Sequence, residues 1–301
     1  MVEILSNWGW DVSFPTAVFI FCSMYIFTVV TIIWIIGLFQ QNHSMMDGFY
    51  GWGYASVGWI AYLAARPTSP VAALLLIMSS LHGARLGYYL SKRWIGYRKI
   101  GTGDARYAGF YQKLQPGYWW KSFLLVMHPQ TIVIMLISLP TIYGITTAPD
   151  QAATIPVLGF VGMAIFGIGL YYEWLADGQL EAFKADSINK GRFVDDGLWV
   201  VAGSPADKDA NAKGGKRYLE TGVWRLTRHP NYFGNTTVWW GIWLTCFASQ
   251  PDLWWTVAGP IFNTIMLTKV LGTAFQDKFM GSRPEYQAMM SKRGGFFPRL
   301  W

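Results

Sequence analysis

The chain has 301 residues, of which 52% are hydrophobic and 17% aromatic, and its 14% of charged residues is far below the roughly 25% of a soluble domain. The formal net charge is +7, but the basic residues are distributed as in a membrane protein, which argues against nucleic acid as a partner. Two cysteines, Cys22 and Cys246, lie inside apolar runs and exclude a disulfide framework or a cysteine zinc site. The first 13 residues hold no Lys or Arg, so we expect the first apolar run to remain in the mature protein.

Apolar runs long enough to cross a bilayer recur along the chain. A helical span needs about 20 apolar residues. We therefore expect an all-α fold, a polytopic membrane helical bundle of about seven transmembrane helices in a single membrane domain. The expected spans are about 14–39, 48–65, 71–91, 121–145, 154–175, 232–249 and 253–273, the second being short and rich in glycine.

The basic residues indicate an orientation. Nearly all of them fall in the segments 92–118 and 176–231 and in the tail, 274–301, whereas the alternate segments hold only Arg66. The positive-inside rule then places the N-terminus outside and the C-terminus in the cytoplasm, which an odd number of spans satisfies. We expect an integral membrane protein whose functional site faces the cytoplasm.

Two cytoplasmic segments have distinct compositions. Residues 200–220, rich in Ala, Gly, Asp and Lys, are expected to form an exposed polar insertion in a loop. The tail, 274–301, mixes basic and aromatic residues, so we expect it to fold back under the bundle.

Polar residues crowd the turn between the first two expected spans. Gln41, His43 and Asp47 fall within "QQNHSMMD", where the membrane should begin. An ionisable group at membrane depth costs about 2.5–3.5 kcal/mol and by default marks a functional cavity. The alternative is an ordinary polar loop in which Asp47 caps the next helix.

The third expected span carries a polar face. His82, Arg85 and Tyr89 are spaced so that they share one side of a helix, with Tyr88 beside them. This face could line a cavity. The alternatives are that Arg85 extends to the membrane surface and that His82 is an ordinary buried histidine.

Two acids lie at the inner end of the fifth expected span. Glu173 and Asp177 are one helical turn apart, and Lys184 follows two turns later on the same face. Anionic headgroups would repel these carboxylates, so they are not membrane anchors. They could accept hydrogen bonds from ribose or amide groups, or they could form a solvated helix end paired with the basic loops.

The sixth span follows the phrase "TRHPNYFGN". Arg228 offers a planar guanidinium suited to phosphate, and Pro230 is suited to the first turn of a helix. A helix N-terminus beside an arginine is a ready anion site. The residues of this candidate site are Arg228, His229, Asn231, Tyr232 and Asn235. Together with the acids, they suggest a pocket with a cationic mouth and an apolar interior.

Several motifs from about Gln40 to Pro298 resemble the membrane-embedded steroid 5α-reductase superfamily. They are "SMMDGFYGWGYA", "LHGARLGYYLSKR", "GDARY", "EWLADGQLEAFK", "GVWRLTRHPNYFG" with "WWG", and "EYQAMMSKRGGFFP". The chain looks most similar to the bacterial, steroid-5α-reductase-like branch, which implies a place in a bacterial inner membrane. The Arg-His-Pro phrase also resembles that of sterol C14 and Δ7 reductases and, in shorter form, isoprenylcysteine-type membrane methyltransferases.

The resemblance implies a seven-helix bundle that holds NADPH in a cytoplasm-side cavity, next to a lipid-accessible substrate cavity. It implies no metal, and no obligate protein partner is evident; the partners expected are membrane lipid and an apolar, steroid-like substrate. By position, the implied cofactor-binding residues are Glu173, Asp177, Lys184, Arg228, His229, Asn231, Tyr232, Asn235, Asp277, Tyr286 and Arg293.

The chain departs from the steroid 5α-reductase pattern at two catalytic positions. Where those enzymes carry a Gln-Glu pair it has Gln40-Gln41, and where they carry a tyrosine after a histidine it has Gly83 after His82. Asp47 is the expected substitute for the acid. Either Tyr88 or Tyr89 is the expected substitute for the phenol. The expected catalytic residues are therefore Gln41, Asp47, His82, Arg85, Tyr88 and Tyr89.

These features favour an NAD(P)H-dependent membrane reductase that transfers hydride to a conjugated double bond of an apolar lipid, of the steroid or isoprenoid type. A hydrogen-bond donor would stabilise the charge that develops on the carbonyl oxygen, and a nearby acid would supply the proton. Two alternatives remain open: an S-adenosylmethionine-dependent membrane methyltransferase, and a non-catalytic membrane protein that binds a lipid or cofactor.

Overall fold

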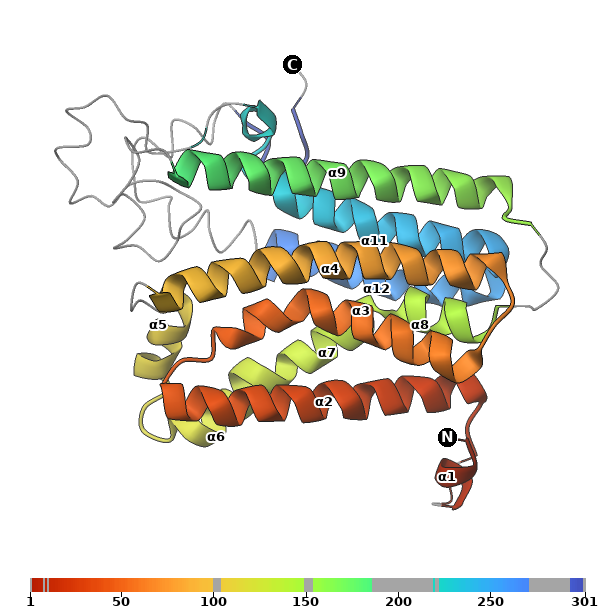
Figure 1. The fold of residues 1–301 in the computed structure, drawn as a ribbon, viewed down its shortest axis with the longest axis horizontal. Coiled ribbons are helices and arrows are strands. Elements are labelled where there is room, and N and C mark those ends of the chain that lie inside the picture. The colour runs from red at the N-terminus through yellow and green to blue at the C-terminus, as the bar shows by residue number, and fades with distance from the viewer. Residues whose placement is uncertain are drawn as a thin grey trace. The chain divides into compact units, whose positions relative to one another are not determined.

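The structure is a computed structural model, and its named elements are all helices (Figure 1). It describes residues 2–7, 9, 11–99, 104–148, 154–185, 219, 222–270 and 293–299. Over this part of the chain, the single β feature is an isolated bridge between Thr227 and Gly294. Most of the expected polar insertion, 200–220, and most of the expected tail, 274–301, lie outside the described residues.

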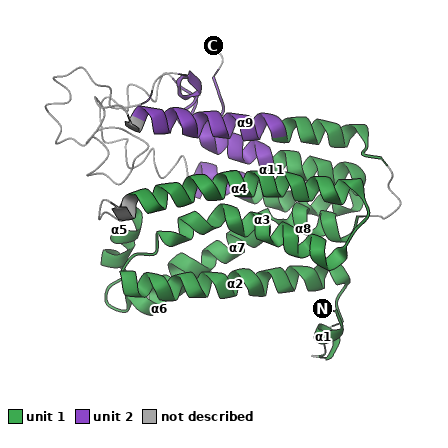
Figure 2. Cartoon of the chain, viewed as in Figure 1, with its two compact units in different colours: residues 1–166, 239–262 green, residues 167–238, 263–301 purple. Residues whose placement is uncertain are grey.

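The chain forms two compact units (Figure 2). Unit 1 comprises residues 1–166 and 239–262, and unit 2 comprises residues 167–238 and 263–301. The helices wholly in unit 1 are α1 (Val2–Asn7), α2 (Phe14–Gln40), α3 (Met45–Ala65), α4 (Pro70–Lys99), α5 (Ala105–Lys113), α6 (Tyr118–Ser122), the π-helix η1 (Phe123–Met127), α7 (His128–Ile137), α8 (Leu139–Thr146) and η3 (Pro251–Val257). Unit 2 holds η2 (Gly222–Arg225) and η4 (Met266–Val270), while α9 (Val157–Ala185), α11 (Pro230–Ser249) and α12 (Ala258–Ile265) contribute to both units.

Four helical segments within the described residues are long and apolar enough to cross a membrane. They are Phe14–Gln40, Pro70–Gly96, Tyr118–Ile137 and Val157–Phe183. The prediction of an all-α membrane bundle is therefore confirmed. The number of seven spans and their orientation stay predictions.

The expected span 121–145 is a succession of helical segments. The π-helix η1 ends at Met127, α7 begins immediately before Pro129, and a turn at Ser138 separates α7 from α8, which carries Pro140 near its start. Proline lacks the N–H that a continuous helix needs and crowds the preceding turn. The breaks therefore follow from the two prolines, which an apolar run alone does not reveal.

Helices α3 and α4 approach each other backbone to backbone. A Cβ atom on Gly51 would lie 2.1 Å from the backbone nitrogen of Gly87 and 2.4 Å from the carbonyl oxygen of Gly83. A Cβ atom on Gly83 would lie 2.6 Å from the carbonyl oxygen of Gly51. Small residues permit such close packing of membrane helices. This contact fixes the start of α3 beside the end of α4.

In unit 2, α9 and α11 make a similar contact. A Cβ atom on Gly234 would lie 2.6 Å from the backbone nitrogen of Glu173, and one on Gly169 would lie 2.7 Å from that of Val238. Helix α11 begins at Pro230, the position predicted for its first turn. The close approach brings the acids of α9 against the amides of α11.

The connection between α2 and α3 is short and tightly turned. Gln41 ends α2 in the left-handed conformation, with a φ of 52°, and the backbone N–H of Asn42 donates to the carbonyl of Gly37. The side-chain oxygen of Asn42 then accepts a hydrogen bond of 2.8 Å from the backbone nitrogen of Ser44. These bonds turn the chain so that His43 is fully buried.

Candidate functional site

Two acid–amide pairs join α9 and α11 in unit 2. Asn235 Nδ2 donates to Glu173 Oε1 at 3.2 Å, and Asn231 Nδ2 donates to Asp177 Oδ1 at 3.1 Å. Both acids are buried, with 2% of Glu173 and 4% of Asp177 exposed. A buried carboxylate is costly without hydrogen bonds, and the asparagine amides reduce this cost. The structure thus brings together four of the residues predicted to bind the cofactor.

A third amide extends this row. Asn263 of α12 is buried, and its Nδ2 donates to Asn235 Oδ1 at 3.1 Å. Because the oxygen of Asn235 is fixed in this way, its nitrogen is directed at Glu173. Asn263 is not among the predicted site residues, although a lone amide inside an apolar run is a signal for it in the sequence.

The predicted arginines Arg228 and Arg293 belong to two segments that are bonded to each other. The backbone nitrogen of Arg228 donates to the carbonyl of Gly294 at 3.0 Å, and its Nη1 donates to the carbonyl of Arg293 at 3.3 Å. Nη1 of Arg293 donates to the carbonyls of Leu219, at 3.1 Å, and Trp224, at 2.9 Å. Bonds to carbonyl oxygens hold a guanidinium in place without neutralising its charge.

The other predicted cofactor residues are placed less completely. The rings of His229 and Tyr232 stack at 5.4 Å between centroids, and His229 is buried. Asp277 and Tyr286 lie outside the described residues, as does the side chain of Lys184.

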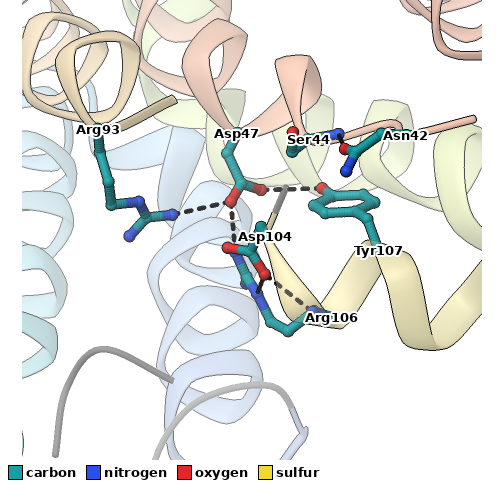
Figure 3. Close-up of polar contacts among 7 residues, drawn as sticks. All are labelled: Asn42, Ser44, Asp47, Arg93, Asp104, Arg106 and Tyr107. Carbon is teal, nitrogen blue, oxygen red and sulfur yellow. Dashed lines mark hydrogen bonds and ion pairs between the residues drawn. The ribbon is translucent and has the colours of Figure 1, made fainter. Parts of the chain in front are cut away.

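In unit 1, Asp47 lies at the centre of a cluster of charged and polar side chains (Figure 3). Its Oδ2 accepts from Arg93 Nη2 at 2.8 Å and from Arg106 Nη2, and its Oδ1 accepts from the Tyr107 hydroxyl at 2.9 Å. Asp104 caps α5, since its Oδ1 accepts from the backbone nitrogen of Arg106 at 3.0 Å, and it also accepts from the Arg106 guanidinium. We call these five residues the Asp47 cluster.

The Asp47 cluster is balanced in charge, with two carboxylates and two guanidinium groups. Burial alone would raise the pKa of Asp47, but the charges of Arg106 and Arg93 outweigh it and hold this pKa below its usual value. Asp47 is therefore ionised at neutral pH. This favours a role in positioning α5 over the role of proton donor that its place in the sequence suggested.

His82 lies in a different cluster of unit 1. It is fully buried, its ring stacks on Tyr54 at 6.2 Å between centroids, and the edge of its ring meets Trp239 at 5.5 Å. His82 is one of the predicted catalytic residues, whereas its aromatic partners on α3 and α11 are not among the predicted site residues.

The remaining catalytic candidates have varied surroundings. The Arg85 guanidinium lies over the ring of Tyr89, at 5.7 Å from its centroid. Tyr88 is 67% exposed, and Gln41 is an exposed cap at the end of α2. Within the described part of the chain, no group of three His, Cys, Asp or Glu side chains is arranged to hold a metal ion.

The helical fold and its long apolar helices define an all-α integral membrane protein. The chain belongs to the family described as "Protein of unknown function (DUF1295)", which matches residues 33–206 and 207–292. This is the steroid 5α-reductase-like family in general, so the resemblance carried by the motifs is confirmed at that level. Its branch within the family stays a prediction.

The chain is also similar to a fungal protein. The chain is 24% identical to Uncharacterized protein C594.04c of Schizosaccharomyces pombe, over 96% of this chain and 82% of that protein. No solved structure matches the chain.

Proposed function

We propose that this protein is an integral-membrane reductase that uses NADPH to reduce a conjugated double bond of an apolar lipid, of the steroid or isoprenoid type. The observation that carries the proposal is the hydrogen-bonded row of Glu173, Asn235 and Asn263 beside the pair of Asp177 and Asn231, in which both acids and Asn263 are buried. The NADPH site of the protein would face the cytoplasm, where NADPH is available.

The residues of unit 2 fit the chemical groups of a phosphorylated dinucleotide. Ribose hydroxyls need acceptors, which the carboxylates of Glu173 and Asp177 provide, and a carboxamide needs both donors and acceptors, which asparagine side chains provide. Phosphates need cations, and Arg228 lies two residues before the first residue of α11. When bound, NADPH would supply the hydride, while these side chains would bind and orient it.

The hydrogen bonds among these residues would also keep the site preorganised. Asn263 orients Asn235, and Asn235 orients Glu173, so the carboxylate is held before any ligand arrives. Preorganised polar groups lose little free energy to reordering on binding. A membrane location suits the second substrate, because an apolar lipid can reach the protein from the bilayer.

Consumption of NADPH by detergent-purified protein tests this proposal. We expect the protein to oxidise NADPH when a conjugated ketone is added, with testosterone and β-ionone as steroid and isoprenoid probes, and to release the reduced ketone. In Arg228→Ala, the loss of a cation at the phosphates should raise the KM for NADPH at least about tenfold, equivalent to about 1.4 kcal/mol. Kinetic titration of NADPH at a fixed ketone concentration measures both effects.

Arg225→Ala is the matched control, because Arg225 is an exposed arginine three residues away. It should leave the KM for NADPH unchanged. An unaltered KM in Arg228→Ala would remove Arg228 from the site. Binding of S-adenosylmethionine in place of NADPH would favour the methyltransferase alternative.

A further inference from the structure

His43 is a buried histidine that is not among the residues of the candidate site. It lies in the connection between α2 and α3 and is fully buried. The last turn of α2 leaves room for its ring: a Cβ atom on Gly37 would lie 2.6 Å from His43 Nδ1. A glycine at this position therefore allows the imidazole to enter the interior of unit 1.

The ring of His43 has one polar partner among the described residues. The hydroxyl of Tyr118, itself buried, lies 3.1 Å from His43 Nδ1. Tyr111 of α5 packs edge-on against Tyr118, at 4.8 Å between ring centroids. Because the Asp47 cluster binds Arg106 and Tyr107 of the same helix, α5 is held in place over the pair of His43 and Tyr118.

The protonation state of His43 follows from its surroundings. Burial lowers the pKa of His43 to about 4, so the imidazole is neutral at pH 7. A phenol is the stronger donor and an imidazole nitrogen the stronger acceptor, so the Tyr118 hydroxyl donates to Nδ1. The proton of the neutral ring is then on Nε2.

Nε2 of His43 is buried and has no hydrogen-bond partner among the residues that the structure describes. A buried donor without a partner loses its hydration without a replacement, so such groups in native proteins generally bind a water or a ligand. The described residues supply no acceptor for this N–H, which is the kind of group that a water or a bound molecule satisfies in native proteins.

We propose that His43 Nε2–H is a binding group for the carbonyl oxygen of the apolar substrate, with Tyr118 fixing the tautomer of the ring. The identity of that substrate as a conjugated ketone rests on the proposed function. A neutral imidazole donates one directed hydrogen bond and brings no charge that would have to be desolvated. His43 is thus a substrate-binding residue. It lies two residues after Gln41, and Gln41 is the position at which the family pattern has an acid.

Nuclear magnetic resonance of protein labelled with ¹⁵N-histidine tests this proposal in the absence of NADPH. The chain has four histidines, and the signals of His43 are identified by their loss in His43→Gln. We expect a single Nε2–H tautomer in the wild type and a mixture of tautomers in Tyr118→Phe. Saturating β-ionone or testosterone should shift the Nε2 signal of His43.

Affinity measurements extend the test to variants. His43→Phe should weaken the binding of the ketone about tenfold, equivalent to about 1.4 kcal/mol, whereas His43→Gln, which keeps an N–H donor at similar reach, should retain most of the affinity. The matched control is His128→Phe, because His128 already packs between the rings of Phe27 and Phe123. It should bind the ketone as the wild type does.

If neither ketone shifts the His43 signal, Nε2 holds only a water and the proposal is overturned. That outcome together with ketone-dependent oxidation of NADPH would leave the proposed reductase function intact. A shifted His43 signal without oxidation of NADPH would retain the ketone site and remove the reductase. Equal ketone affinities of His43→Phe and the wild type would also contradict this role.

Discussion

Gly83→Val is expected to prevent the folding of unit 1. A Cβ atom at this position would lie 2.6 Å from the carbonyl oxygen of Gly51 and 2.9 Å from the backbone nitrogen of Ala55, and valine adds two further carbons. Backbone atoms cannot rotate away as a side chain can, so α3 and α4 would have to separate along their contact. We expect a loss of at least about 3 kcal/mol, the upper end for overpacking.

The yield of monodisperse protein in detergent and its melting temperature measure this effect. Gly96→Val is the matched control, since Gly96 lies on the same helix and a Cβ atom there would meet nothing within 4 Å. Both variants carry the same intrinsic cost of placing valine in a helix. Equal melting temperatures of the two variants would show that α3 and α4 do not meet through their glycines.

Asp47→Ala is expected to destabilise the protein by about 2–4 kcal/mol. The substitution leaves Arg93 and Arg106 without the carboxylate between them, and breaking a buried ion pair from one side costs about 3–5 kcal/mol. We reduce this figure because the side chain of Arg106 is 33% exposed, whereas those of Arg93 and Asp47 are 14% and 13% exposed. The Tyr107 hydroxyl loses its acceptor as well.

The pH dependence of this effect has a definite sign. Because the pKa of Asp47 is lowered in the folded state, its contribution to stability is fully present above the ordinary carboxyl pKa of about 4. The contribution disappears as the pH falls through the folded-state value. The difference in free energy of unfolding between wild type and Asp47→Ala, measured by chemical denaturation, should therefore be largest near pH 7 and shrink as the pH is lowered below about 4.

Asp252→Ala provides the control for Asp47→Ala, because Asp252 is an exposed acid in the first turn of η3. It should change the free energy of unfolding by less than about 0.5 kcal/mol. A similarly small change in Asp47→Ala would show that the cluster does not hold α5. In the double variant with Arg93→Ala, the loss should be smaller than the sum of the two single losses.

The helices and one half of the candidate site were predictable from local patterns. Apolar length identified the membrane bundle, and the spacing of Glu173 with Asp177 showed that these acids share a helix face. Asn231 and Asn235 are likewise four residues apart and therefore share a face of their helix. These features depend on residues one turn apart, and the period of the helix alone determines them.

The contacts between distant segments were not predictable in the same way. The partners of Asp47 lie 46 and 59 residues further along the chain, and nothing in the local pattern of Arg93 or Arg106 links them to it. The motif "GDARY" was recognised as a family feature, but its function as a cap and a pair of donors to Asp47 required the structure. The same holds for His43, whose partner Tyr118 is 75 residues away.

Mass spectrometry of the small molecules released from detergent-purified protein tests the central claim most directly, because it requires no knowledge of the substrate. The claim is that the hydrogen-bonded acid–amide row of Glu173, Asn235 and Asn263, with the arginines of unit 2, holds a nicotinamide dinucleotide. We predict that NADP(H) co-purifies with the wild type and that less of it co-purifies with Arg228→Ala. Release of S-adenosylmethionine, or of no nucleotide from protein that is folded and monodisperse, would contradict the account.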